Sequence, residues 1–423
     1  MKESKDKIVK LGIIGLGWRT EVLLVSLFAI DAVEISAICD LSDKAVAKIK
    51  SIFLKSGRPI PAAFNNYNDL LQKNDIDAVL IPTSWNSHLP IAAAAMKAGK
   101  YTAIEVGGAS STEELWQLVH ASEGTGAHCM MLENCCYARN ELMILNMARQ
   151  GLFGELIHCC GGYEHDLRDE LIPRMKEGFE RTFHNKYRNC DLYPTHQLGP
   201  IAKILNINRG NRFLSLVSMA SKSRGLGLYV KDHSGRESQE SEIAFNKGDV
   251  VTTIIKCAGG ETITLTHSVS LPRPYSRNGR VQGTRGIWLE DVDGIHIEGI
   301  SSSTKEFDVS GNPYTVHHWD TVQSFYDKYD HPIWRDYKDN IVGGHGGMDC
   351  LALMAFIDAV RHKIAPPIDV YDCAAWMSVT CLSEQSIALG SMPVAVPDFT
   401  NGKWIKRESV PINKWSLTNV YKD

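Results

Sequence analysis

Residues 190–200, CDLYPTHQLGP, place Tyr193 and His196 three positions apart at the start of an apolar run. Phenol and imidazole groups transfer protons and hydrogen-bond to developing negative charge. Thr195 is a residue type that caps helices, so we predict a helix that begins here and carries His196 in its first turn. The alternative interpretation is structural: a capped helix with a hydrogen-bonded histidine.

The composition restricts the class of protein that can present these groups. A chain of 423 residues exceeds one ordinary core, so we expect two domains. With 44% hydrophobic and 22% charged residues, the chain is typical of globular proteins. The net charge of −4, without a basic run, argues against nucleic-acid partners and anionic membrane surfaces. Residues 22–30, an apolar run, are too few to span a bilayer.

Four of the 11 cysteines form two adjacent pairs, and none has C-x-x-C spacing. This pattern indicates free thiols in a reducing compartment, so we expect a cytoplasmic protein. The alternative is a periplasmic protein from which an export signal was removed, although no cleavage site follows the first apolar segment. Neither an HExxH sequence nor a zinc-finger pattern occurs, and we therefore expect no metal.

Residues 8–40 have the order strand, glycine turn, helix, strand and acid that is typical of dinucleotide-binding domains. Gly15 and Gly17 would let the backbone approach a pyrophosphate at the helix N-terminus. Asp40 would bind ribose hydroxyls and repel a 2′-phosphate, which favours NAD over NADP. Thr20 replaces the third glycine of the motif, and we expect looser packing of the helix on the strand.

The same alternation continues through residues 66–105, which predict helix, strand, loop, helix and strand. The carboxyl ends of parallel strands face the cofactor, so residues 83–88 and 105–106 are candidate NAD contacts. For Trp85 the alternative is loop packing, and for His88 it is a helix-cap partner. We expect an α/β Rossmann domain, a doubly wound parallel sheet, in residues 1–133.

Residues 134–423 predict a second, substrate-binding α+β domain with an open, mainly antiparallel sheet. A helix is expected at 140–150, ended by Gly151. Strands are expected at 155–166, 213–221, 250–258, 261–270, 285–291 and 294–299, with a hairpin turn at 258–260. The C-terminal segment predicts two helices and a closing strand, and it could return to pack on the first domain. Residues 344–347 around His345 are either a flexible turn or a loop that closes over the site.

This organisation resembles the glucose–fructose oxidoreductase and inositol dehydrogenase family (Gfo/Idh/MocA). Members of that family typically carry Glu-Lys-Pro at the end of the fifth strand, where the lysine serves in hydride transfer. Here the strand ends AIEVGGA, with Glu105 followed by Val106 and Gly107. The resemblance therefore implies a chain poorly suited to be an ordinary dehydrogenase.

A narrower resemblance covers residues 9–403. The strings ENCCYARNELM, RQGLFGELIH, LYPTHQLGPIAKIL, GTRGIW and GGHGGMD, with much of residues 370–400, are similar to glycoside hydrolase family 109, NAD-dependent α-N-acetylgalactosaminidases. The resemblance implies cofactor contacts at Trp18, Arg19, Asp40, Trp85, Asn86, Ser87, His88, Glu105, Val106 and Asn134. It implies a sugar pocket of Tyr163, Arg181, Tyr193, Pro194, Thr195, His196 and Tyr275. Glu133 lies in a matching motif and is kept as a further candidate.

The family resemblance also implies a mechanism. NAD transiently oxidises sugar C3, the ketone acidifies the C2 proton, the C1–O bond breaks by elimination, water adds, and the hydride returns. We expect His196 and Tyr193 to act on the C3 oxygen and Tyr163 on the C2 proton. Arg181 would supply positive charge, and Tyr275 would position the ring.

Three alternatives stay open at the level of sequence. One is an NAD-dependent sugar or inositol dehydrogenase, the second is a non-catalytic sugar sensor, and the third is the same mechanism on another glycoside. In each case we expect a small-molecule or glycan ligand. Because open sheets of this kind often pair face to face, fold analogy also predicts a homo-oligomer.

Overall fold

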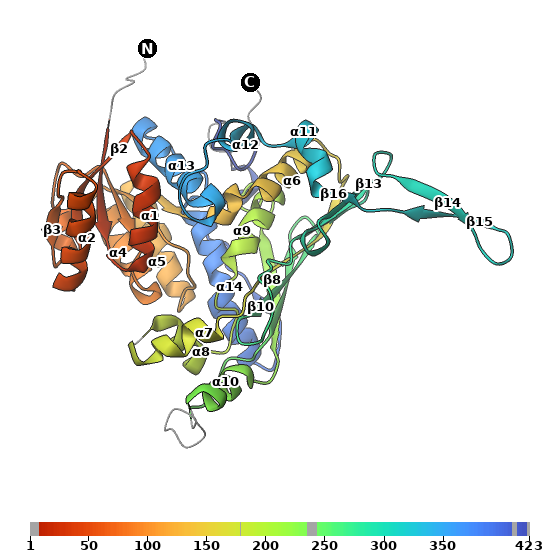
Figure 1. The fold of residues 1–423 in the computed structure, drawn as a ribbon, viewed down its shortest axis with the longest axis horizontal. Coiled ribbons are helices and arrows are strands. Elements are labelled where there is room, and N and C mark those ends of the chain that lie inside the picture. The colour runs from red at the N-terminus through yellow and green to blue at the C-terminus, as the bar shows by residue number, and fades with distance from the viewer. Residues whose placement is uncertain (1–7, 178, 235–242, 408–412, 421–423) are drawn as a thin grey trace, which may run out of the picture.

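The computed structural model describes residues 8–177, 179–234, 243–407 and 413–420. The N-terminal part contains a parallel sheet of six strands in the order β3-β2-β1-β4-β5-β6 (Figure 1). This is the order of a doubly wound dinucleotide-binding sheet, as predicted. The strands are β1 (Val9–Ile14), β2 (Val33–Cys39), β3 (Ala62–Phe64), β4 (Ala78–Ile81), β5 (Tyr101–Ile104) and β6 (Cys129–Met131).

Five helices connect these strands: α1 (Trp18–Phe28), α2 (Asp43–Lys55), α3 (Tyr67–Leu71), α4 (Trp85–Lys97) and α5 (Thr112–Thr125). Thr20, where we expected looser packing of the helix on the strand, is tied to the glycine turn. Thr20 is fully buried in the first turn of α1, and its hydroxyl donates to the carbonyl oxygen of Gly15 at 2.6 Å. A hydrogen bond thus holds the helix to the glycine turn where the motif usually relies on a glycine.

The second sheet has nine strands in the order β16-β13-β12-β11-β7-β10-β9-β8-β17. All neighbours are antiparallel except β7 and β10, so the prediction of a mainly antiparallel sheet is confirmed. The strands are β7 (Leu156–Glu164), β8 (Phe213–Ala220), β9 (Val251–Cys257), β10 (Thr262–Ser268), β11 (Arg280–Gly283), β12 (Gly286–Leu289), β13 (Gly294–Ile297), β16 (Asp320–Thr321) and β17 (Val394–Ala395). The short strands β11 and β16 were not predicted, because neither has an apolar run.

Helices α6 (Arg139–Arg149), α9 (Thr195–Ile204), α13 (Met348–His362) and α14 (Val370–Ala388) lie between the two sheets (Figure 1). Helix α9 packs on β7 and α14 packs on β8. In the other direction, α14 contacts α5 and α13 contacts α1. The C-terminal helices therefore join the second sheet to the Rossmann sheet.

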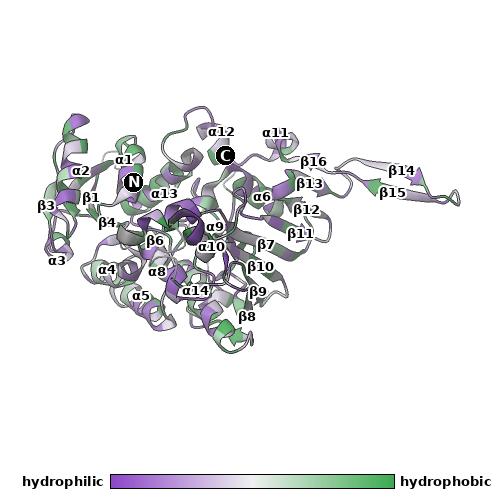
Figure 2. Cartoon of the chain, turned by 60° about the horizontal axis from the view of Figure 1, so that its bottom comes forward, coloured by the Kyte–Doolittle hydropathy of each residue, from purple (hydrophilic) through white to green (hydrophobic). Residues whose placement is uncertain are grey.

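Two further strands, β14 (Ser303–Phe307) and β15 (Pro313–His317), pair only with each other in a ribbon. The ribbon extends away from the rest of the protein and carries both hydrophilic and hydrophobic residues (Figure 2). Its side chains are almost all exposed, so it has no alternation of buried and exposed positions from which strands could be predicted. Among the residues described, no helix is both long enough and apolar enough to cross a bilayer.

The predicted capping role of Thr195 is wrong. Helix α9 begins at Thr195 itself, the preceding residue is Pro194, and no side chain caps the helix. The reason is local: Pro194 has helical backbone angles, so the turn starts one residue earlier than a threonine cap requires. His196 nevertheless lies in the first turn of the helix, as predicted.

Candidate active site

A cavity of about 550 Å³ lies at the carboxyl ends of the parallel strands, with walls from both parts of the chain. Its lining contains fifteen of the residues that sequence analysis singled out. They are Gly17, Trp18, Arg19, Thr83, Ser84, Trp85, His88, Glu105, Val106, Asn134, Tyr163, Arg181, Tyr193, His196 and His345. The cofactor motif and the Tyr-Pro-Thr-His segment, far apart in sequence, therefore meet in one site.

Other predicted residues lie beside this cavity and do not line it: Gly15, Asp40, Asn86, Ser87, Pro194, Thr195 and Tyr275. The Asp40 carboxylate accepts hydrogen bonds from the backbone N–H of Leu16 at 2.7 Å and of Ser42 at 2.8 Å. The Tyr275 ring packs edge-on against that of Tyr163, with 6.2 Å between the ring centroids. Both side chains therefore border the site.

The glycine turn fits a dinucleotide. Gly15 has a φ of +98°, and a Cβ at this position would lie 2.7 Å from Cγ2 of Thr83. A Cβ on Gly17 would meet no atom within 4 Å, because this glycine borders the open cavity. Helix α1 begins at the next residue, so its unpaired N–H groups face the space where a pyrophosphate binds.

Arg19 joins the two parts of the chain at this end of the cavity. Its Nε donates to Glu105 Oε1 at 2.7 Å, and Nη1 and Nη2 donate to the two oxygens of Asp349 at 2.9 and 2.8 Å. Asn134 also donates to Asp349, at 2.7 Å. Burial acts to lower the pKa of Arg19, but the two carboxylates outweigh it and raise that pKa. The guanidinium is therefore fixed by carboxylates.

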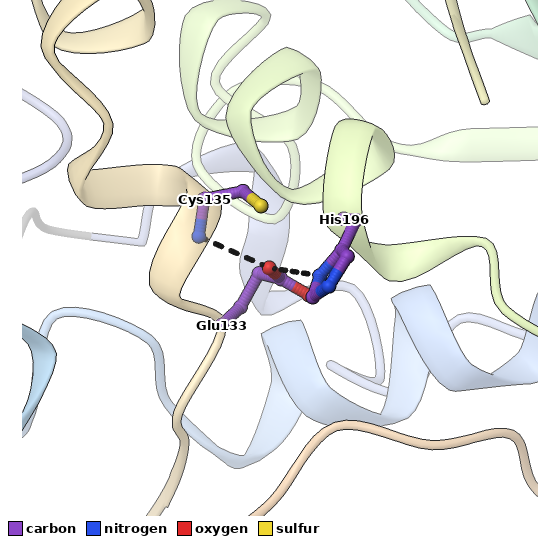
Figure 3. A group of neighbouring side chains, drawn as sticks. All are labelled: Glu133, Cys135 and His196. Carbon is purple, nitrogen blue, oxygen red and sulfur yellow. Dashed lines mark hydrogen bonds and ion pairs between the residues drawn. The ribbon is translucent and has the colours of Figure 1, made fainter. Parts of the chain in front are cut away.

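His196 is oriented by a buried carboxylate, as Figure 3 shows. Its Nδ1 lies 2.8 Å from Oε1 of Glu133, which also accepts from the backbone N–H of Cys135 at 3.2 Å. Burial alone would raise the pKa of Glu133, but the adjacent imidazole and the hydrogen bonds lower it. A carboxylate on Nδ1 fixes the ring and leaves Nε2 for a ligand, which is the arrangement found around histidine general bases.

Glu133, Cys135 and His196 offer three potential metal ligands within 4.8 Å of one another. Burial raises the pKa of the Cys135 thiol well above its usual value, so this thiol stays protonated unless a metal ion displaces its proton. Glu133 already accepts from both neighbours. The arrangement therefore fits an oriented histidine better than a metal centre.

Two tyrosines and an arginine form the wall next to His196. The ring centroid of Tyr193 lies 4.8 Å from that of His196 and 4.7 Å from that of Tyr163. The Arg181 guanidinium lies 4.9 Å from the Tyr193 centroid. Burial raises the pKa of both phenols, although Arg181 acts in the opposite direction. Both tyrosines are therefore neutral and able to donate a hydrogen bond.

The departure from Glu-Lys-Pro has a steric explanation. A Cβ on Gly107 would lie 2.7 Å from Cδ1 of Trp85, so the indole occupies the space that a proline ring needs. Val106 is buried and lines the cavity. Trp85 therefore lies against the strand end and is also a wall of the cavity.

His88 has a structural contact of its own. Its Nε2 lies 2.8 Å from the carbonyl oxygen of Thr83, and the ring is almost fully buried. Burial lowers the pKa of His88 to about 4. A neutral ring that bonds its own loop positions the cavity wall and is unsuited to proton transfer near neutral pH.

Sequence analysis missed several residues of the cavity wall: His165, Leu167, Glu170, Arg174, Phe179 and Glu180. Glu180 accepts from the backbone N–H of Trp85 at 2.5 Å and of Asn86 at 2.9 Å, and so caps helix α4 from the other part of the chain. The one feature of the sequence that could have indicated these wall residues is the high density of charged residues between 164 and 181. Asp349 was missed as well, although it directly follows the GGHGGM sequence.

Comparisons with known proteins agree with this geometry. Residues 9–133 match the family model described as Oxidoreductase family, NAD-binding Rossmann fold. The fold and the cavity thus define a dinucleotide-binding protein of the oxidoreductase type with a second sheet domain. Residues 137–406 match the model of the glycosyl hydrolase 109 C-terminal domain. The chain belongs to glycosyl hydrolase family 109.

Among curated relatives, an alpha-N-acetylgalactosaminidase of Tannerella forsythia is 42% identical over 429 residues, covering 96% of this chain and 89% of the relative. One from Shewanella oneidensis is 41% identical over 408 residues, covering 95% and 87%. Among solved structures, myo-inositol 2-dehydrogenase from Lactobacillus plantarum aligns with a TM-score of 0.64 at 15% identity, over 92% of this chain and all of that one. Scyllo-inositol dehydrogenase from Lactobacillus casei, with bound NAD(H) and scyllo-inositol, aligns with a TM-score of 0.61 at 13% identity, over 92% of this chain and 99% of that one. These structures share the fold.

Proposed function

We propose that this protein hydrolyses terminal α-linked N-acetylgalactosamine with the help of NAD. The observation that carries the proposal is the position of His196, which is bonded to buried Glu133 and lines the same cavity as Gly17. An oriented histidine beside a dinucleotide site fits a reaction that needs a base and a hydride acceptor. Val106 stands where the dehydrogenases of the wider family have a lysine, and this disfavours a simple dehydrogenase. The names of the two curated relatives support this substrate.

When bound, NAD supplies a reversible hydride acceptor for sugar C3. In the proposed reaction, His196 takes the proton of the C3 hydroxyl through Nε2, while Glu133 stabilises the resulting imidazolium. Tyr193 donates a hydrogen bond to the C3 oxygen. That bond strengthens when the neighbouring carbon loses its proton, because negative charge then develops on this oxygen.

Tyr163 acts on the C2 proton in this proposal. Because burial raises the pKa of its phenol, the phenolate needs the positive charge of Arg181 beside it. Loss of the C2 proton expels the group at C1, and water then adds across the resulting double bond. The overall change is hydrolysis without net oxidation, because the hydride taken from C3 returns to it.

The cofactor preference is also part of the proposal. Asp40 lies directly after β2 and holds two backbone N–H groups of the adjoining turns. A carboxylate at this place has oxygen lone pairs left for ribose hydroxyls and repels a 2′-phosphate. We therefore expect much tighter binding of NAD than of NADP, which titration calorimetry would measure.

The expected homo-oligomer has some structural support. Met219 and Ile254 are exposed on the face of the nine-stranded sheet that points away from α9 and α14, with 65% and 46% of their surface accessible. Pairing of two copies through this face would bury them. Light scattering of the purified protein, compared before and after a Met219→Lys substitution, would test this pairing.

For the location we keep the cytoplasmic proposal. The cysteines are free thiols, and most of them are buried. Free thiols persist in reducing compartments. Fractionation of the producing cell would test it.

The central experiment is release of p-nitrophenol from p-nitrophenyl α-N-acetylgalactosaminide in deuterated water with NAD. We expect release, deuterium at sugar C2, and no net NADH. The dehydrogenase alternative predicts NADH from a free sugar and no p-nitrophenol, and is disfavoured by Val106. Release of p-nitrophenol without deuterium at C2 would contradict the elimination. If this glycoside releases no p-nitrophenol and a galactoside or glucoside analogue does, the substrate is that other sugar.

A further inference from the structure

We propose that Arg277 is a positioning residue for the sugar pocket. It fixes residues 269–279, which we call the Tyr275 loop, against the segment that carries Glu133. This loop connects β10 to β11. The inference rests on the proposed function, because Tyr275 and His196 act on the sugar only in that proposal.

One side of the Tyr275 loop is held by Glu164, the residue that follows Tyr163 on β7. The backbone N–H of Ser276 donates to the carbonyl oxygen of Glu164 at 2.9 Å, and the N–H of Glu164 donates back to Ser276 at 3.1 Å. The buried carboxylate of Glu164 accepts from Nδ2 of Asn278 at 3.2 Å. These contacts attach the loop to the strand on which Tyr163 lies.

Arg277 attaches the other side of the loop. Its guanidinium forms an ion pair with Glu141, in the first turn of α6, and its Nη2 donates to Oε1 of Glu290 at 3.2 Å. The side chains of Arg277 and Glu141 are 11% and 2% accessible, so the pair is shielded from water. Glu290 also accepts from the backbone N–H of Gly279 at 2.8 Å and thereby holds the end of the loop.

The same guanidinium lies beside the turn that orients His196. Cys135 belongs to this turn, just before α6; burial raises the pKa of its thiol, and Arg277 acts in the opposite direction. The backbone N–H of Cys135 donates to Glu133, the carboxylate that bonds His196. Arg277 therefore connects the side of the sugar pocket that carries Tyr275 to the side that carries His196.

The buried ion pair determines orientation more than it stabilises the fold. The cost of removing two charges from water offsets most of their attraction, so such a pair contributes little net stability. A guanidinium is planar, however, and its N–H groups meet a carboxylate only in a narrow range of directions. Because Tyr275 is two residues from Arg277, loss of this constraint should move the Tyr275 ring relative to Tyr163 and to a bound sugar.

The test is a double-mutant cycle on the full chain with NAD, measured as kcat/KM for p-nitrophenol release. Arg277→Lys keeps the charge and loses the planar group, and Tyr275→Ala removes the ring through which Arg277 acts. We expect Arg277→Lys to lower kcat/KM about tenfold in the wild type, as for a displaced contact to the substrate. In the Tyr275→Ala background the same change should lower it by less than about twofold.

The matched control is Arg209→Lys. Arg209 is also a buried arginine between two carboxylates, Asp369 at 2.7 Å and Asp372 at 2.9 Å, and it does not line the cavity. We expect this control to leave kcat/KM of the folded protein unchanged. An unchanged kcat/KM in Arg277→Lys would overturn the inference, and so would equal losses in the wild type and in Tyr275→Ala.

If Arg277→Lys does not fold, the double variant Arg277→Met and Glu141→Leu takes its place in the cycle, because it removes both charges of the buried pair together. If the wild type cleaves no glycoside, the proposed function fails. The inference is then decided by crystal structures of the wild type and the variant: a displaced Tyr275 ring would support it, and an unmoved ring would overturn it.

Discussion

Two histidines that line the same cavity are each held by a buried carboxylate, but the pairs differ in the exposure of the histidine and in the number of side chains that the carboxylate holds. Glu133 is fully buried and holds His196, whose side chain is 12% accessible. Asp349 is equally buried but divides its two oxygens among Arg19, Asn134 and His345, and the side chain of His345 is 46% accessible.

The difference shows how similar pairs acquire different tasks. A carboxylate whose side-chain partner is a single histidine fixes the ring and stabilises its charged form. A carboxylate shared among three side chains from distant parts of the chain mainly joins those parts together. Changes to Glu133 and His196 should therefore act on turnover, and changes to Asp349 on the stability of the fold.

The largest effect is expected from His196→Ala. Removal of a general base costs about 10³-fold in rate, so kcat for p-nitrophenol release should fall by that order while NAD still binds. The measurement is kcat together with the NAD content of the purified protein. His362→Ala is the control, and near-normal turnover of His196→Ala would remove this residue from the mechanism.

Glu133→Gln should lower kcat by about 10²-fold, because glutamine can bond to the ring but cannot stabilise its positive charge. Glu133 is fully buried, so we do not expect a water molecule to take the place of its carboxylate beside the imidazole. The readout is kcat for p-nitrophenol release, with the NAD content of the purified variant as a check that it is folded. An unchanged kcat would show that Glu133 has only a packing role.

Asp349→Asn should lower the free energy of unfolding by about 2 kcal/mol at pH 7, because Arg19 and His345 lose a charged acceptor. Burial acts to raise the pKa of Asp349, but His345 and Arg19 outweigh it and lower that pKa. A carboxyl group whose pKa is lower in the folded protein than in the unfolded chain stabilises the fold at pH values above its unfolded pKa, which is about 4. This stabilisation is lost as the pH falls below that value toward the folded pKa. Urea unfolding should therefore show that the difference between wild type and variant narrows below about pH 4.

An equal difference at neutral and at strongly acidic pH would mean that Asp349 acts through shape and not through charge. A large fall in kcat without a change in stability or in NAD binding would contradict the distinction between the two pairs.

Much of the fold follows from local sequence patterns. The glycine turn, strands β1, β2, β4 and β5 of the first sheet and the alternating strands β8, β9 and β10 were predicted, because their periodicity is strong. Strand β11, RVQG, and the exposed ribbon β14–β15 were not. Their strand structure is determined by hydrogen-bonded neighbours and not by a buried face.

The candidate site could be predicted only where its residues follow a motif. Tyr193 and His196 occur together in sequence, whereas Arg19 and Asp349 are 330 positions apart and Glu180 caps a helix 94 positions before it. Such pairs are determined by the way α8 (Glu180–Tyr187) and α13 pack against the Rossmann part of the chain. Periodicity within a short stretch of sequence contains no information about that packing.

The contact between Gly107 and Trp85 constrains the order in which this site could change during evolution. A proline at 107 cannot be accepted while the indole lies 2.7 Å from the place that a Cβ would take. The Lys-Pro pair of the related dehydrogenases therefore requires that Trp85 be replaced or displaced first. Trp85 also forms a wall of the cavity, so that first step would alter the site before the second could compensate. A substitution at Gly107 and the position of the Trp85 ring are therefore coupled.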